Sequence, residues 1–129
     1  MNEIEAVPQL RVLVVEDEAG LCELACIWVE SLGFDVVGVD SPDQALAQLA
    51  AERFDVLFSD VMMPGSMDGV ALAHEAKRRH PGLRVVLTSG HPQRLLDDPN
   101  VPGEALGKPY SKAELAEAIQ RTGTGNRAA

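Results

Sequence analysis

Three carboxylates stand where two apolar segments of the sequence end. Residues 10–15 read LRVLVV and run into Glu16 and Asp17, and residues 55–59 read DVLFS and run into Asp60. If these segments are neighbouring strands, the carboxylates share one crevice and raise one another's pKa unless a cation neutralises them. An all-oxygen cluster is typical of a hard ion such as Mg²⁺. Taken singly, Asp17 fits an ordinary helix cap and Asp60 an ordinary strand end.

A hydroxyl and an ammonium group follow two further apolar segments. Thr88 comes directly after residues 83–87, and Lys108 comes directly after residues 104–107 and before a proline. A lysine supplies a point charge suited to phosphate, and a threonine hydroxyl can donate a hydrogen bond to a phosphate oxygen. Most lysines are solvated surface residues, but the strand-end position of Lys108 favours a phosphate-binding role.

Apolar segments alternate with helical periodicity along the chain. The first is too continuously apolar for a strand with one wet face, which predicts a parallel sheet covered on both sides. We predict strands at 10–15, 34–39, 55–59, 83–87 and 104–107, and helices at about 18–32, 42–53, 68–79, 93–97 and from Ser111 onward. This order predicts an α/β fold with a doubly wound, five-stranded parallel sheet of flavodoxin-like order 2-1-3-4-5. Ligands of such sheets bind at the carboxyl ends of the strands.

Length and charge limit the classes of protein that the sequence fits. The chain has 129 residues, with 20 acidic and 11 basic side chains and a formal charge of −9. We predict one domain at 10–122, an N-terminal extension at 1–9 and a flexible tail at 123–129. The acidic balance argues against nucleic acid or an anionic membrane as partner. The sequence has no apolar run of transmembrane length, and Glu3 and Glu5 stand where a signal peptide carries basic residues. We therefore predict a cytoplasmic protein.

Two cysteines lie in the first predicted helix. Cys22 and Cys26 are four residues apart, which fits neither a disulfide framework nor a metal site without further ligands. We interpret them as buried, reduced, apolar side chains. Together with Ile27 and Val29 they extend the apolar surface of this helix beyond one stripe, so the helix is either deeply buried or a docking surface.

Four motifs in order resemble the receiver domains of two-component response regulators. They span nearly the whole chain, and their combined spacing is more specific than any one of them. The motifs are Glu16-Asp17, Asp60 with Met62-Met63-Pro64 and Met67-Asp68-Gly69, Thr88-Ser89-Gly90, and Lys108-Pro109-Tyr110.

The resemblance implies a phosphoacceptor signalling domain, not an enzyme with a separate substrate. It implies that Asp60 accepts the phosphoryl group, and that Asp17, Asp60 and the backbone carbonyl of Met62 bind Mg²⁺ directly while Glu16 acts through water. Thr88 and Lys108 would bind the phosphoryl oxygens.

The resemblance also implies partners and a backbone feature. The phosphoryl donor would be the phosphohistidine of a histidine kinase or of a histidine phosphotransfer protein, and output would pass to a downstream protein target. Self-catalysed phosphotransfer and autodephosphorylation would set the lifetime of the signal. The peptide bond between Lys108 and Pro109 would be cis.

The chain departs from the usual receiver pattern at two places. Receivers usually carry an aromatic switch residue three positions before the lysine, and here that position is Ala105. His91 either substitutes for the aromatic residue or is an exposed loop histidine. The loop after Asp60 is one residue longer than the commonest pattern, at residues 64–67, a feature of receivers in hybrid histidine kinases.

Two other classes of function compete with a phosphoacceptor. A phosphohydrolase with an aspartyl-phosphate intermediate places a second aspartate two residues after the nucleophile, and here that residue is Met62. A flavodoxin-like nucleotide binder needs glycines after the first strand, where this chain is acidic. Because few residues follow Thr122 and the chain begins with Met1, we expect a single-domain phosphoacceptor, although a receiver of a hybrid kinase would have the same features.

Overall fold

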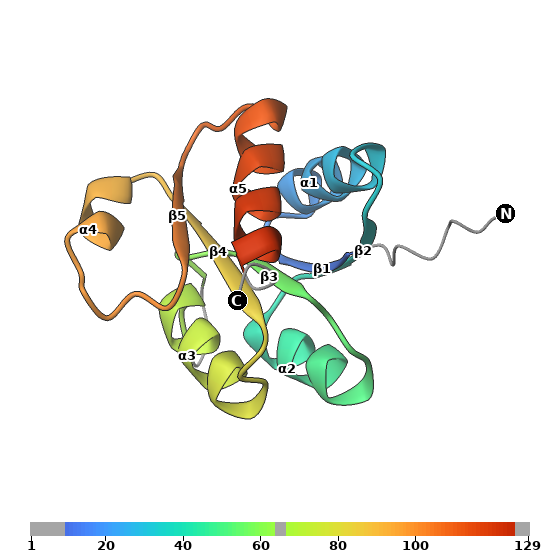
Figure 1. Cartoon of the computed structure of the whole chain (residues 1–129), viewed down its shortest axis with the longest axis horizontal. Coiled ribbons are helices and arrows are strands. Elements are labelled where there is room, and N and C mark those ends of the chain that lie inside the picture. The colour runs from blue at the N-terminus through green and yellow to red at the C-terminus, as the bar shows by residue number, and fades with distance from the viewer. Residues whose placement is uncertain (1–9, 64–66, 126–129) are drawn as a thin grey trace, which may run out of the picture.

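The chain forms a parallel β-sheet with helices on both faces (Figure 1). The computed structural model describes residues 10–63 and 67–125. Its elements are β1 (Arg11–Val15), α1 (Ala19–Ser31), β2 (Asp35–Val39), α2 (Pro42–Ala51), β3 (Val56–Asp60), α3 (Gly69–Arg79), β4 (Arg84–Ser89), α4 (Pro92–Leu96), β5 (Glu104–Gly107) and α5 (Lys112–Gly125). The strand order is β2-β1-β3-β4-β5 and all pairs are parallel, so the predicted fold and topology are confirmed.

Alternate residues of the strands enter two separate apolar layers. On β1, Leu13 and Val15 belong to the layer that α2 and α3 cover, whereas Val12 and Val14 belong to the layer that α1 and α5 cover. Figure 1 shows these helix pairs on opposite faces of the sheet. All five residues of β3 are buried, so the strand that ends at Asp60 is held from both sides.

Capping interactions fix where helices begin. The Ser111 hydroxyl accepts the Glu114 N–H at 3.0 Å and the Glu114 carboxylate accepts the Ser111 N–H at 2.8 Å, which forms a capping box before α5. Ser41 caps α2 by accepting the Gln44 N–H at 3.2 Å. The Gln44 side chain does not complete a capping box, because it accepts the Asp40 N–H instead of that of Ser41.

The helix ends also differ in detail from the predictions. Helix α2 ends at Ala51, about two residues early, and α5 continues to Gly125, so residues 123–125 of the predicted tail are helical. Residues 1–9, 64–66 and 126–129, which carry the predicted extension, most of the lengthened loop and the rest of the tail, lie outside the described residues. Within the described part of the chain, each helix is too short or too polar to cross a bilayer.

Candidate functional site

The register of the sheet brings the predicted site residues to one edge. Asp60 is the last residue of β3 and lies directly opposite Thr88 of β4. Strand β1 ends at Val15, opposite Ser59, so Glu16 follows at the same edge. The Lys108 N–H donates to the Ser89 carbonyl at 2.9 Å, which anchors the residue after β5 there too. The sheet therefore assembles one site from four separate segments.

Three carboxylates of the site lie close enough together to share one cation. Glu16, Asp17 and Asp60 each offer an oxygen, and these oxygens all lie within 4.8 Å of one another. Glu16 and Asp60 are each only 7% exposed, whereas Asp17 is exposed. Because every donor is a carboxylate oxygen, the set fits a hard divalent ion such as Mg²⁺. Asp17 is not the cap of α1, since that position is Glu18 and no side chain caps it.

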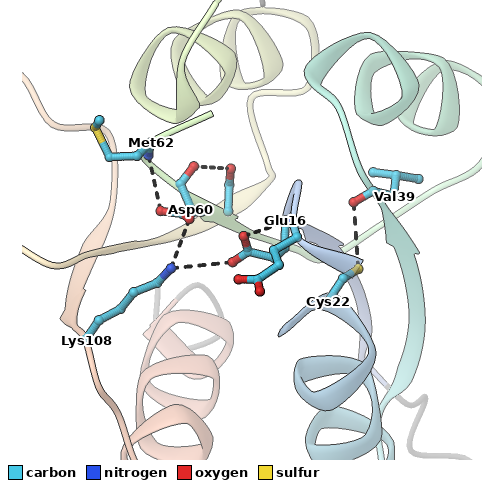
Figure 2. A network of polar contacts seen from close by, with 8 residues as sticks. Glu16, Cys22, Val39, Asp60, Met62 and Lys108 are labelled. Atoms are coloured by element: carbon cyan, nitrogen blue, oxygen red, sulfur yellow. Dashed lines mark hydrogen bonds and ion pairs between the residues drawn. The ribbon is translucent and has the colours of Figure 1, made fainter. Parts of the chain in front are cut away.

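Lys108 supplies the positive charge of this cluster. Its Nζ lies 2.9 Å from Asp60 Oδ2 and 3.5 Å from Glu16 Oε1, and Figure 2 shows the ammonium group reaching both acids. Partial burial lowers the pKa of Lys108, but the hydrogen bond and charge of Asp60, helped by Glu16, outweigh that effect and raise it. Lys108 is therefore a fixed cation beside the Asp60 carboxylate.

Glu16 is the carboxylate of the acid cluster whose pKa is raised. Burial raises its pKa, and the neighbouring Asp60 charge raises it further, while Lys108 and the Glu18 N–H act in the opposite direction. Burial and the Asp60 charge together therefore outweigh the effect of Lys108. A bound cation would act in the same direction as Lys108 and lower the pKa of Glu16.

The backbone around Asp60 holds its carboxylate in one orientation. The Met62 N–H donates to Asp60 Oδ1 at 3.1 Å, while Lys108 occupies Oδ2, so each carboxylate oxygen has its own donor. Ser59 Oγ donates to the Asp60 carbonyl at 2.9 Å. Gly69, the first residue of α3, lies so close to this carbonyl that a Cβ added to it would clash with the carbonyl oxygen. The start of α3 therefore fixes the end of β3.

Thr88 faces Asp60 with an unused hydrogen-bonding group. The residue is 2% exposed, and its hydroxyl oxygen has no hydrogen-bond partner among the residues that the structure describes. A buried polar group without a partner costs about 1–3 kcal/mol, so natural proteins keep one only for a reason. A ligand at Asp60 that offers oxygen acceptors would supply the missing partner.

Ala105 and His91, the two residues considered for the aromatic switch, lie on β5 and shortly after the end of β4. Ala105 is half-buried and packs against the apolar layer under α2 and α3. His91 is exposed, and its backbone N–H donates to Ser89 Oγ at 2.9 Å, so its loop is tied to the end of β4. The aromatic residue near the site is instead Tyr110, which packs edge-on against Trp28 and Phe58. The Lys108–Pro109 bond is cis, as the resemblance implied.

The structure also adds residues that sequence reasoning missed. Gly69 lies in the motif Met67-Asp68-Gly69, but its close approach to Asp60 depends on where α3 packs. The Met62 N–H holds the Asp60 carboxylate, whereas only the Met62 carbonyl was expected to take part. The glycine directly after the cap residue Asp68 was the available signal for the first of these contacts.

Comparisons with known proteins agree with this geometry. Residues 12–120 match the sequence model of the family described as "Response regulator receiver domain". The response regulator receiver protein CpdR of Brucella abortus is 30% identical over 114 residues, which are 86% of this chain and 94% of CpdR. The nitrogen assimilation regulatory protein NtrX of Azorhizobium caulinodans is 37% identical over 81 residues, 62% of this chain but only 18% of NtrX. The chain spans about a quarter of several related transcriptional regulators.

A solved structure gives the same fold. The response regulator protein TrrA of Thermotoga maritima, in complex with Mg²⁺ and BeF, superposes with a TM-score of 0.80 at 23% identity, covering 88% of this chain and 99% of that chain.

Proposed function

This chain belongs to the family of response regulator receiver domains, which are signalling domains of two-component systems, and we propose that its Asp60 accepts a phosphoryl group in a Mg²⁺-dependent reaction. One observation carries the proposal. A buried aspartate is held between a lysine at 2.9 Å and a backbone N–H at 3.1 Å, opposite a buried threonine hydroxyl without a partner.

The metal would be held by the acidic end of the site. Glu16, Asp17 and Asp60, together with the carbonyl of Met62, offer only oxygen donors, as Mg²⁺ prefers. When bound, Mg²⁺ neutralises the carboxylates and the charge that gathers on phosphoryl oxygens. A bound cation would act in the same direction as Lys108 on Glu16, whose pKa burial and the Asp60 charge raise.

The protein side chains perform the transfer by position and charge. An Asp60 carboxylate oxygen attacks the phosphorus of a phosphohistidine, the new P–O bond forms as the P–N bond breaks, and the imidazole leaves with the electron pair and takes a proton. Lys108 would then pair with a phosphoryl oxygen in place of the carboxylate. Thr88 would donate its free hydroxyl proton to another phosphoryl oxygen, which removes the penalty of its burial.

The proposed donor is a histidine kinase or a histidine phosphotransfer protein. Helix α1 offers a docking surface, because Leu21, Leu24 and Ile27 are 43%, 43% and 53% exposed on a helix next to the acid cluster. This exposure favours the docking interpretation of the apolar helix over deep burial. A downstream protein target is proposed for the output.

A phosphohydrolase is disfavoured by the residue two positions after Asp60. Met62 is 70% exposed and has no group that could transfer a proton to a leaving group or water. We therefore propose that slow self-catalysed hydrolysis, rather than rapid turnover, ends the phosphorylated state.

The decisive experiment is intact-mass spectrometry after incubation with Mg²⁺ and acetyl phosphate. The wild-type chain should gain the mass of one phosphoryl group, and should gain none when EDTA removes the metal. Asp60→Asn should stay unmodified, whereas Asp43→Asn, an exposed aspartate of α2, should react like the wild type. Modification of the Asp60→Asn chain to the wild-type extent would show that Asp60 is not the acceptor.

A further inference from the structure

A second polar feature lies between α1 and β2, apart from the phosphoacceptor site. A shallow groove there is lined by Cys22 and Cys26 together with Ala19, Glu23, Gly38, Val39, Asp40 and Gln44. Both cysteines are free thiols and are half-buried, so they are less enclosed than the sequence suggested. Residues four apart on a helix share one face, so both thiols border the same groove.

The two sulfur atoms converge on one point of β2. A Cβ added to Gly38 would lie 2.7 Å from the Cys26 sulfur and 3.0 Å from the Cys22 sulfur. The sulfurs therefore cannot be farther apart than these two distances together. Two metal–thiolate bonds of about 2.3 Å each span at most about 4.6 Å, so a bridging ion requires the sulfurs to lie at the closer part of that range. The missing side chain of Gly38 is what allows both thiols to turn toward β2.

This arrangement disfavours both common roles of a cysteine pair. Cβ atoms four residues apart on a helix are about 5–6 Å apart, whereas a disulfide needs about 3.5–4.5 Å, so α1 would have to unwind. Structural zinc takes four ligands. Among the described residues, the only group of three or more histidine, cysteine, aspartate or glutamate ligands is Glu16, Asp17 and Asp60, so no third ligand of these types joins the two sulfurs.

We propose that Cys22 and Cys26 together bind one soft, thiophilic ion of the Cu(I) class. Thiolates select Cu(I) by their softness, and this d¹⁰ ion accepts two ligands where zinc needs more. Binding forms two copper–sulfur bonds and releases the two thiol protons, and the copper stays monovalent, so no oxidant or reductant takes part. The sequence argument against a metal site rested on missing ligands, and it does not apply to an ion that needs only two.

The environment of the thiols keeps both of them protonated in the free protein. Burial raises the pKa of Cys22, and it raises the pKa of Cys26 to about 12, so both are protonated and weakly nucleophilic at neutral pH. The Cys22 thiol points toward the Val39 carbonyl at 3.8 Å, a weak contact that binding would replace (Figure 2). Because the thiolate is the form that binds a metal, these raised pKa values oppose binding, and an ion must displace both thiol protons.

The test uses the full chain, reduced and free of metal, under anaerobic conditions. Cu(I) is added as its complex with a chromogenic chelator, and transfer to the protein is read from the loss of the chelator's colour. The wild type should take up one equivalent, and Cys22→Ser and Cys26→Ser should each lose this uptake while keeping the wild-type circular dichroism spectrum. Gly38→Ala, which keeps both ligands but displaces the sulfurs, should bind more weakly.

Two controls make the result decisive. Asp60→Asn should take up copper as the wild type does, so failure of the phosphoacceptor proposal and failure of this one give different results. X-ray absorption of the copper-loaded wild type should show two sulfur neighbours, a readout that needs no variant. The proposal would be overturned if the serine variants took up as much copper as the wild type. It would also be overturned if the spectrum showed nitrogen and oxygen neighbours instead of two sulfur neighbours.

Discussion

The two halves of the sheet differ in how firmly they hold their part of the site. In the β1–β3 half, β3 is buried at every position, and Gly69 seats α3 directly on the Asp60 carbonyl. In the β4–β5 half, β5 is half-buried throughout and the adjacent α4 has only five residues. We infer that the first half fixes the reacting carboxylate and the second half responds to what binds there.

The lysine and threonine connect these halves. Lys108 follows β5 but pairs with Asp60 and Glu16 of the first half, and Thr88 of β4 lies opposite Asp60 with a free hydroxyl. A phosphoryl group would engage both residues at once. The β4–β5 half would then have contacts that it lacks in the unmodified protein, which is how one local reaction can shift a population of conformations.

The largest effect is expected in the fixed half, at the metal ligands. Asp17→Asn removes an anionic group expected to bind Mg²⁺ directly, whereas Glu16→Gln removes one expected to act through water. Glu16→Gln should weaken Mg²⁺ binding by about 10-fold, and Asp17→Asn should weaken it more. Isothermal titration calorimetry measures both. If the two variants lost Mg²⁺ affinity equally, or lost none, the roles assigned to Asp17 and Glu16 would be wrong. The acid cluster would then not support the difference between the two halves of the sheet.

The next effect concerns the seat of α3 on β3. Gly69→Ala adds a Cβ that clashes with the Asp60 carbonyl and lies 2.8 Å from the Val61 Cα, both of which are backbone atoms. Urea unfolding should show a loss of about 1–3 kcal/mol, and phosphorylation from acetyl phosphate should slow. Gly82→Ala is the matched control, because a Cβ there has no neighbour within 4 Å. If both variants unfold alike, the first half is less constrained than we infer.

A smaller effect is expected at Thr88 in the responding half. Thr88→Val replaces a buried hydroxyl without a partner by a methyl group, so the unmodified protein should gain about 1 kcal/mol in its free energy of unfolding. Thr88→Ser keeps the hydroxyl and should instead lose about 1 kcal/mol with the methyl group. Chemical denaturation compares the two. A loss of stability in Thr88→Val would mean that its hydroxyl has a partner in solution.

Particular residues show what could be read from the sequence. The five strands and the start of the last helix at Ser111 follow from local patterns, because strand and helix signals span only a few residues. The sheet order, and with it the convergence of Asp60, Thr88 and Lys108 at one edge, follows from the doubly wound fold that the alternation of strands and helices predicts. The clash-limited approach of Gly69 and the free hydroxyl of Thr88 could not be predicted. Both depend on the distance between elements far apart in the sequence, which no local pattern records.

The groove that Cys22 and Cys26 line is a second feature that local sequence patterns record only in part. The spacing of Cys22 and Cys26 was visible, and it placed them on one helix face. That both sulfurs turn toward Gly38 depends on β2 pairing with β1 beneath α1, which is a tertiary fact. The interpretation of two reduced, apolar side chains agrees with the fold, in which both free thiols pack partly buried against the apolar layer under α1 and α5, whereas their proposed role as ligands rests on the tertiary contact with β2.

The smallest expected effect is a change in amide exchange after β4, and it tests the difference between the two halves of the sheet most directly. Ala105 has no ring that could rotate inward, so we expect a phosphate on Asp60 to act without a ring rotation on β5. It can act through Thr88, whose strand continues into Ser89, and the Ser89 hydroxyl in turn accepts the His91 N–H. The short helix that follows is anchored by the buried Leu95 and ends in a turn at Asp98, a segment of low intrinsic stability.

We therefore expect the response to centre on residues 89–102. Hydrogen–deuterium exchange with Mg²⁺ and beryllium fluoride as a phosphate mimic should slow at these amides by about 5-fold or more, while β3 and α3 change little because they are already held. Thr88→Val should bind the mimic but lose most of this protection, whereas Thr88→Ser should keep it. Protection confined to β5 and α5, or equal in both halves, would show that the signal passes through the strand that carries Ala105, and the division into a fixed and a responding half would be wrong.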